Sequence, residues 1–177
     1  MLEKTEKWVE SLAKSVAVLG GIVLTAVALM TVVSIIGRAS IKLGLSPIPG
    51  DFELVEAGVA FVVCAFLPWG QLKRGHASVA ILTDNMGKTV NLTIDLIADF
   101  LLLATSLVIT WRHILGLLDK QRYGETTFIL QYPLWWAYAV SLVGLVTWIV
   151  VGIWCVANGA DALARNFRSS KNTGVAR

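Results

Sequence analysis

The stretch from Asp51 to Leu72 constrains the fold more than any other part of the chain. It follows the turn residues Pro49 and Gly50 and consists mostly of apolar residues. As a helix it would measure about 33 Å, which is enough to cross the hydrocarbon core of a bilayer. Three further apolar stretches are at least as long. They lie at about residues 15–37, 90–118 and 133–157.

The composition agrees with an all-α integral membrane protein built from four transmembrane helices. Of the 177 residues, 56% are hydrophobic and only 15% are charged. A soluble domain of this size could not bury so much apolar surface in one core. The net charge of +3 comes mostly from residues at the ends of the predicted spans, so it does not indicate nucleic-acid binding.

The segments outside the spans are predicted to lie at the membrane surface. Residues 1–14 read as an amphipathic helix, residues 76–87 as an interfacial segment, and residues 166–177 as a polar tail. Most of the 15 lysines and arginines lie in the N-terminal segment, in the loop between the second and third spans, and in the tail. Because cytoplasmic loops carry the excess of positive charge, both termini are predicted to face the cytoplasm.

Several charged residues lie within the predicted spans. Glu53 and Glu56 lie near the outer end of the second span, Asp95 and Asp99 near the inner end of the third, and Arg112 near its outer end. Intramembrane charges usually face a partner or a cavity, although Glu53 could simply interact with the positive end of its helix. We expect an ion pair between Arg112 and either Glu53 or Glu56 first, and a contact to another subunit second. A proton or cation path comes last, because such a path normally needs inverted repeats or broken helices.

No pattern in the sequence indicates catalysis or a bound cofactor. There is no HExxH motif, no phosphate-binding loop and no plausible nucleophile–base pair. His76 and His113 are predicted on opposite sides of the membrane, about 30 Å apart, so they could not share a metal or a haem. We therefore expect no enzymatic activity, no metal site and no cofactor.

Two motifs and the architecture together form a family pattern. The acidic second span leads into the motif R-G-H-x-x-V, which contains Arg74 and His76. The fourth span opens with the motif P-x-W-x-x-Y, formed by Pro133, Trp135 and Tyr138. With four spans and both ends inside, the chain resembles the small membrane subunit (DctQ-like, or Q subunit) of tripartite ATP-independent periplasmic (TRAP) transporters.

The resemblance implies a non-catalytic permease subunit in the bacterial inner membrane. In such transporters a large membrane subunit (M subunit) carries the substrate and sodium ions and moves as an elevator. A periplasmic substrate-binding protein delivers an organic acid, such as a sialic acid or a C4-dicarboxylate. The small subunit would scaffold the large one in this sodium-coupled symport, and the sodium ions would bind to the partner rather than to this chain.

The residues singled out above become candidates for structural or partner contacts. They are Glu53, Glu56, Arg74, His76, Asp95, Asp99, Arg112, Pro133, Trp135 and Tyr138. The alternative reading is a stand-alone small membrane transporter or exporter that uses Glu56 and Asp99. Substrate specificity is expected to reside in the other two subunits, so the solute is not encoded here.

Overall fold

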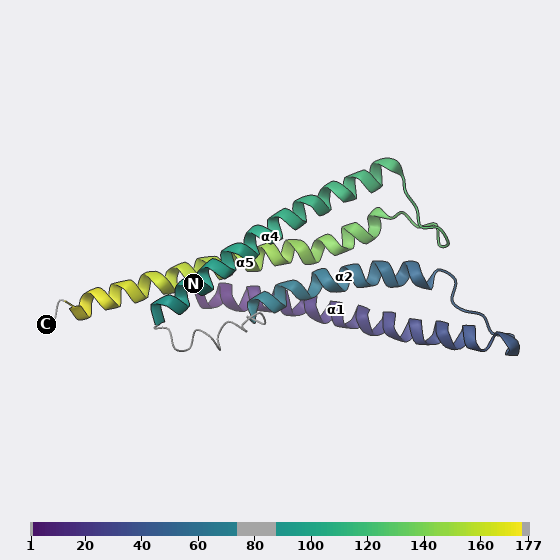
Figure 1. The fold of residues 1–177 in the computed structure, drawn as a ribbon, viewed down its shortest axis with the longest axis horizontal. Coiled ribbons are helices and arrows are strands. Elements are labelled where there is room, and N and C mark those ends of the chain that lie inside the picture. The colour runs from purple at the N-terminus through teal and green to yellow at the C-terminus, as the bar shows by residue number, and fades with distance from the viewer. Residues whose placement is uncertain (1, 74–87, 175–177) are drawn as a thin grey trace.

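The computed structural model describes residues 2–73 and 88–174 (Figure 1). These ranges hold four long helices, α1 (Leu2–Ala39), α2 (Asp51–Leu72), α4 (Lys88–Tyr123) and α5 (Trp135–Gly174), and a short 3-10 helix η1 (Ile41–Leu43). Each long helix has the length and the apolar composition needed to cross a membrane. The prediction of an all-α protein with four membrane-spanning helices is confirmed.

In the half of the molecule where α2 begins, the four helices lie side by side in one layer, in the order α1, α2, α5, α4, whereas toward the other end α4 crosses α5 (Figure 1). Each helix packs against its neighbour in this order, and α1 also meets α5. At one end of the layer the helices converge, whereas at the other the pair α1–α2 and the pair α5–α4 diverge (Figure 1). We name these the closed end, where α2 finishes, and the open end, where α2 begins. Toward the open end the layer is one helix thick, so both of its broad faces are left uncovered by the described chain.

An apolar core joins α1, α2 and α5 at the closed end. Val9 and Ala13 of α1 are buried against Val151 and Cys155 of α5, and Trp69, Leu72 and Trp154 surround them. Residues 2–14, from the segment predicted to lie on the membrane surface, continue into the first span as one helix. Val9 and Ala13 on its apolar side pack against other helices, and its position at the membrane surface stays a prediction.

The contact between α2 and α5 depends on a proline and a glycine. Pro68 has no N–H, so the carbonyl group of Cys64, four residues earlier, has no partner within the helix. Gly144 of α5 approaches this carbonyl so closely that an added Cβ would lie 2.6 Å from its carbon and its oxygen. The absence of a side chain thus lets the two backbones touch, as small residues do between membrane helices. α2 continues through Pro68 to Leu72, and the expected early end at the proline is not found.

The helix ends agree with the predicted spans in one case and differ in the others. The second span has the predicted bounds. α4 extends beyond the predicted 90–118 at both ends, and α5 begins two residues after Pro133 and includes most of the predicted tail. Arg74, His76 and the predicted interfacial segment 76–87 lie outside the described residues.

Candidate functional site: the hairpin and the polar pocket at the open end

Residues 125–134, which connect α4 to α5, form a short hairpin. Thr126 and Pro133 pair as an antiparallel bridge, and the Thr127 N–H donates to the Tyr132 carbonyl at 3.0 Å. Gln131 adopts a positive φ of 58°, which turns the chain back toward α5. We call residues 128–130 the hairpin tip.

Glu53, in the first turn of α2, binds this tip and so holds it against the pair formed by α1 and α2. Its carboxylate accepts the backbone N–H of Ile129 at 2.6 Å and that of Leu130 at 2.9 Å. The hydroxyl group of Tyr132 donates to the Glu53 carbonyl at 3.2 Å. Gly50 precedes α2 with a φ of 73°, and any side chain there would collide with Leu130. These contacts bring together segments more than 70 residues apart in the sequence.

Asp51 fastens the start of α2 to the end of α1 in a similar way. Its carboxylate accepts a hydrogen bond from the Ser34 hydroxyl at 2.5 Å and from the Phe52 N–H at 2.9 Å. The Arg38 guanidinium group lies 3.6 Å from the same carboxylate. The two acids of the first turn therefore hold α2 between α1 on one side and the hairpin on the other.

A polar pocket of about 250 Å³ lies beneath the hairpin, between α2, α4 and α5. Its lining includes Glu56 of α2, His113 of α4 and Tyr132 of the hairpin. The His113 ring stacks on Tyr138 with ring centres 4.9 Å apart, and its Nε2 lies 2.9 Å from the Tyr138 carbonyl oxygen. Because a carbonyl oxygen only accepts, the Nε2 atom carries the proton of this hydrogen bond. Burial and the nearby carboxylates of Glu53 and Glu56 raise the pKa of the Tyr132 phenol, so it remains a donor.

The predicted ion pair between Arg112 and Glu53 or Glu56 is not formed. Glu53 is engaged by backbone N–H groups, and no ion pair joins Arg112 to an acid within the described residues. Successive residues of a helix point about 100° apart, so His113 faces α5 while Arg112 turns away from it and is exposed. The other two predicted uses of these charges, a contact to another subunit and a transport path, are left open by this geometry.

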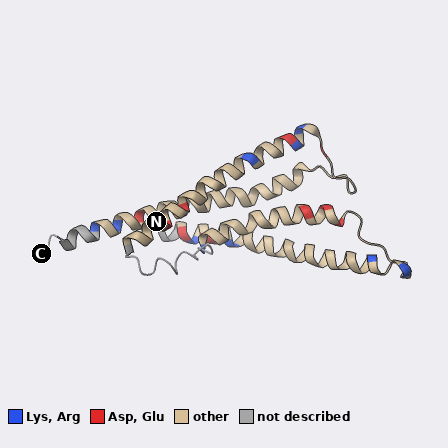
Figure 2. Cartoon of the chain, in the orientation of Figure 1, with Lys and Arg blue, Asp and Glu red and all other residues tan. Residues whose placement is uncertain are grey.

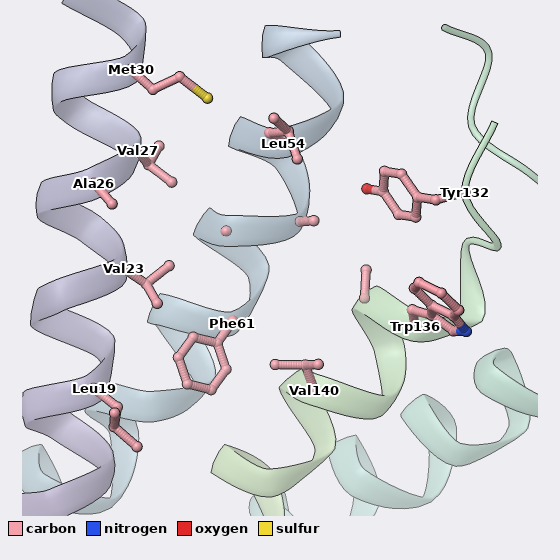
Figure 3. A pocket seen from close by; sticks show the side chains of 13 residues that line it. Leu19, Val23, Ala26, Val27, Met30, Leu54, Phe61, Tyr132, Trp136 and Val140 are labelled. Atoms are coloured by element: carbon pink, nitrogen blue, oxygen red, sulfur yellow. The ribbon is translucent and has the colours of Figure 1, made fainter. Parts of the chain in front are cut away.

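An apolar groove of about 930 Å³ opens between α1, α2 and the beginning of α5. Figure 3 shows Val23, Met30 and Phe61 facing Trp136 and Val140 across it. Along the described helices and loops, no group of three or more His, Cys, Asp or Glu side chains is arranged to hold a metal ion. The open end thus combines hydrogen bonds between segments, a small polar pocket and an apolar surface.

The chain matches the family model described as tripartite ATP-independent periplasmic transporters, DctQ component, over residues 27–162. This range is more than half of the chain and includes α2, α4, the hairpin and the start of α5. The chain belongs to the DctQ family. No curated protein and no solved structure matches it. Membership makes it a small membrane subunit of a TRAP transporter and confirms the family resemblance.

The remaining candidate residues of this DctQ subunit are spread over both ends of the layer. Asp99, only 5% exposed, lies on α4 where an added Cβ at Gly159 of α5 would be 3.9 Å from its Oδ2 atom. Asp95 lies one turn earlier and is half-buried. Both belong to the half of α4 farther from the hairpin. The acids on α2 and the acids on α4 therefore do not form one cluster.

The motif at the start of α5 has a mainly structural place in the DctQ subunit. The Pro133 carbonyl accepts the Trp136 N–H at 3.1 Å in the turn that leads into α5, but Pro133 itself lies before the helix and not in its first turn as predicted. Trp135 packs edge-on against Trp136 with ring centres 6.1 Å apart. Tyr138 supplies both the ring and the carbonyl group that His113 contacts. Contacts between these side chains and a partner subunit remain a prediction.

Three contributors were not anticipated from the sequence: the hairpin tip, Gly144, and the buried hydrogen bond that the Trp148 indole N–H donates to the Gln71 amide oxygen. A turn could have been expected from Gly124 and the polar residues after it. Gln71 is a long polar residue near the end of an apolar span, which is itself a signal for a buried hydrogen bond. The sequence carries no comparable signal that joins Glu53 to residues 129 and 130.

Proposed function

We propose that this DctQ subunit is a non-catalytic scaffold in a sodium-coupled TRAP transporter of the inner membrane. Its partners are the large M subunit, which carries the solute and the sodium ions, and a periplasmic substrate-binding protein. The solute is an organic acid of the sialic acid or C4-dicarboxylate class. Family membership and the single helix layer support this role.

The single layer is the observation that carries the proposal. For α1, α2 and α4, only 11–17% of the most apolar window is buried within the chain, against 44% for α5. Figure 2 shows the described charged residues gathered toward the two ends of the layer. Between these ends the buried polar side chains include Ser106, Thr110 and Thr147, and each donates to a carbonyl group of its own helix. Hydroxyls used in this way favour a scaffold over a polar route for a solute. Broad apolar faces suit packing against lipid and against a larger membrane partner.

The stand-alone transporter reading is less well supported by the same geometry. Glu56 lies near the open end of α2, whereas Asp99 lies on the half of α4 nearer the closed end. Groups in opposite halves of the layer would need a polar path between them. The polar pocket that Glu56 lines meets α4 at His113 and has no lining residue from the half of α4 that carries Asp99.

In the proposed orientation the closed end faces the cytoplasm and the open end faces the periplasm. The basic residues Arg165 and Arg168 on the extension of α5 support it, because positive charge concentrates on the cytoplasmic side. A membrane-impermeant maleimide should label Thr126→Cys in intact spheroplasts and label Arg168→Cys only after permeabilisation. These variants are made in a chain in which Cys64 and Cys155 are replaced by alanine. The reverse labelling pattern would contradict this orientation.

The scaffold role is tested by tagging the chain at its native expression level and extracting it in mild detergent. We expect one large membrane protein to co-purify in stoichiometric amount. The chain alone in liposomes should take up no solute under a sodium gradient, and uptake should require the large subunit and the binding protein. Sodium-driven uptake by the chain alone, or a stable chain with no partner, would instead favour the stand-alone reading with Glu56 and Asp99 as its working groups.

A further inference from the structure

The hairpin tip presents apolar side chains to the exterior of the molecule. Phe128 is 91% exposed, Ile129 is 55% exposed, and Leu130 is also exposed although it contacts Gly50. Phe52, on the neighbouring first turn of α2, is exposed as well. Single exposed apolar residues are common on proteins, but a contiguous group marks contact with another protein or with a membrane.

The depth of the tip follows from the length of α2. This helix has 22 residues and therefore measures about 33 Å, close to the roughly 30 Å thickness of the hydrocarbon core. Both ends of α2 must then lie near the boundary between hydrocarbon and headgroups. Because Glu53 in its first turn binds Ile129 and Leu130, the tip lies at the same boundary and not above it (Figure 1).

Two backbone N–H groups of the tip already have hydrogen-bond partners within the chain. An N–H group without a partner is costly in a lipid environment, which is why loops seldom enter it. Here the N–H groups of Ile129 and Leu130 both donate to the Glu53 carboxylate, and that of Tyr132 donates to the Thr127 hydroxyl at 3.2 Å. The carboxylate itself lies at a helix N-terminus, where a negative charge is favoured.

We propose that the hairpin tip is a membrane anchor, with Phe128 and Ile129 inserted at the boundary between headgroups and acyl chains. Glu53 is the positioning residue that holds the tip at this depth. The anchor fixes the height of the open end, where α1–α2 and α5–α4 diverge. This inference depends on the four spans alone and not on the proposed solute, sodium coupling or partner subunit.

Spin-label accessibility tests the depth of the tip. A nitroxide is placed at Phe128→Cys in the full chain with Cys64 and Cys155 replaced by alanine. The protein is reconstituted, with any membrane partner that co-purifies, into vesicles of phosphatidylethanolamine and phosphatidylglycerol. Val63→Cys, exposed in the middle of α2, is the lipid reference, and Gln121→Cys, exposed at the end of α4, is the aqueous reference.

We expect the label at position 128 to collide with oxygen nearly as often as the label at position 63. Its accessibility to a water-soluble nickel chelate should be several-fold lower than that at position 121. Nickel accessibility equal to that at position 121 would overturn the anchor. Low accessibility to both reagents, or protection only after the binding protein is added, would also overturn it and would assign the tip to a protein partner.

Two further variants test the role of Glu53. Glu53→Gln keeps the shape of the side chain but places an amide NH₂ where the carboxylate accepted a backbone N–H group, so the label at position 128 should become several-fold more accessible to nickel. Glu56→Gln, one turn later and without a hydrogen bond to the hairpin, is the matched control and should leave the label in lipid. An unchanged label in Glu53→Gln would overturn the positioning role.

Discussion

The two ends of the helix layer are held together by different kinds of interaction. At the closed end, buried apolar residues of α1, α2 and α5 interdigitate, and Trp148 donates a buried hydrogen bond to Gln71 at 2.6 Å. At the open end, Asp51 and Glu53 hold the neighbouring segments through hydrogen bonds, and a groove and a pocket separate the helices. The closed end is held by a packed core, and the open end is held by hydrogen bonds between neighbouring segments.

This difference indicates how each end would respond to change. A packed core loses stability as a whole when its shape is altered, because its contacts depend on close fit. A few hydrogen bonds between segments can break locally while the rest of the protein stays folded. The subunit thus combines a rigid base with an end whose spacing depends on a few hydrogen bonds. Substitutions at the two ends should separate global from local effects.

The largest effect is expected where α2 and α5 touch through their backbones. Gly144→Ala would place a Cβ 2.6 Å from the Cys64 carbonyl, and a backbone atom cannot move aside as a flexible side chain can. We expect a loss of about 1–3 kcal/mol, seen as a lower melting temperature in detergent. Gly70→Ala, on α2 with open space around it, is the control and should be neutral or slightly stabilising. Equal melting temperatures for the two variants would contradict the close contact.

The buried hydrogen bond of the closed end should have the next largest effect. Trp148→Phe would leave the Gln71 amide oxygen without its donor, and the Gln71 Nε2 atom has no hydrogen-bond partner within the described structure. We expect a loss of about 1–3 kcal/mol. The double variant with Gln71→Leu should cost about 1 kcal/mol less than the sum of the single variants. Additive losses in this double-mutant cycle would show that the two side chains do not interact.

The spans of this chain are predictable because hydrocarbon demands long apolar stretches, and α2 has the bounds expected from its sequence. The head of α1 shows a limit of the same reasoning. Its amphipathic pattern fits a surface helix, yet Val9 and Ala13 use that pattern to pack against other helices. Periodicity identifies an apolar side, but it does not say what covers that side.

The hydrogen bonds that the Glu53 carboxylate accepts from the hairpin tip could not be predicted from the sequence, for a physical reason. A search for opposite charges points from Glu53 to Arg112, because a residue of opposite charge at a similar predicted depth is the pairing signal that the sequence offers for Glu53. In the structure, two backbone N–H groups satisfy the carboxylate, and their positions depend on the hairpin turn at Gln131. Every residue has a backbone N–H except proline, so the sequence does not mark which ones will be used.

A smaller and more local effect is expected from loosening the open end. Glu53→Gln should speed hydrogen exchange at the amides of Ile129 and Leu130, because the glutamine amide offers one acceptor oxygen where the carboxylate offered two. The melting temperature should change less than in Gly144→Ala, since the closed core is untouched. Glu56→Gln should alter neither quantity. A fall in melting temperature as large as that of Gly144→Ala would mean that the open end also supports the global fold.

The smallest effect is expected from the ion pair at the closed end. Lys73 lies 2.5 Å from Glu10 and 4.8 Å from the centre of the Trp69 ring, but about half of each charged side chain is exposed to solvent. Water and salt screen such a pair, so Lys73→Met should leave the melting temperature unchanged within error at physiological ionic strength. A small decrease should appear only at low salt, and Glu10→Gln should behave in the same way. A clear loss at physiological salt would show that the closed end depends on charge as well as on packing, and the contrast between the two ends would then be one of degree.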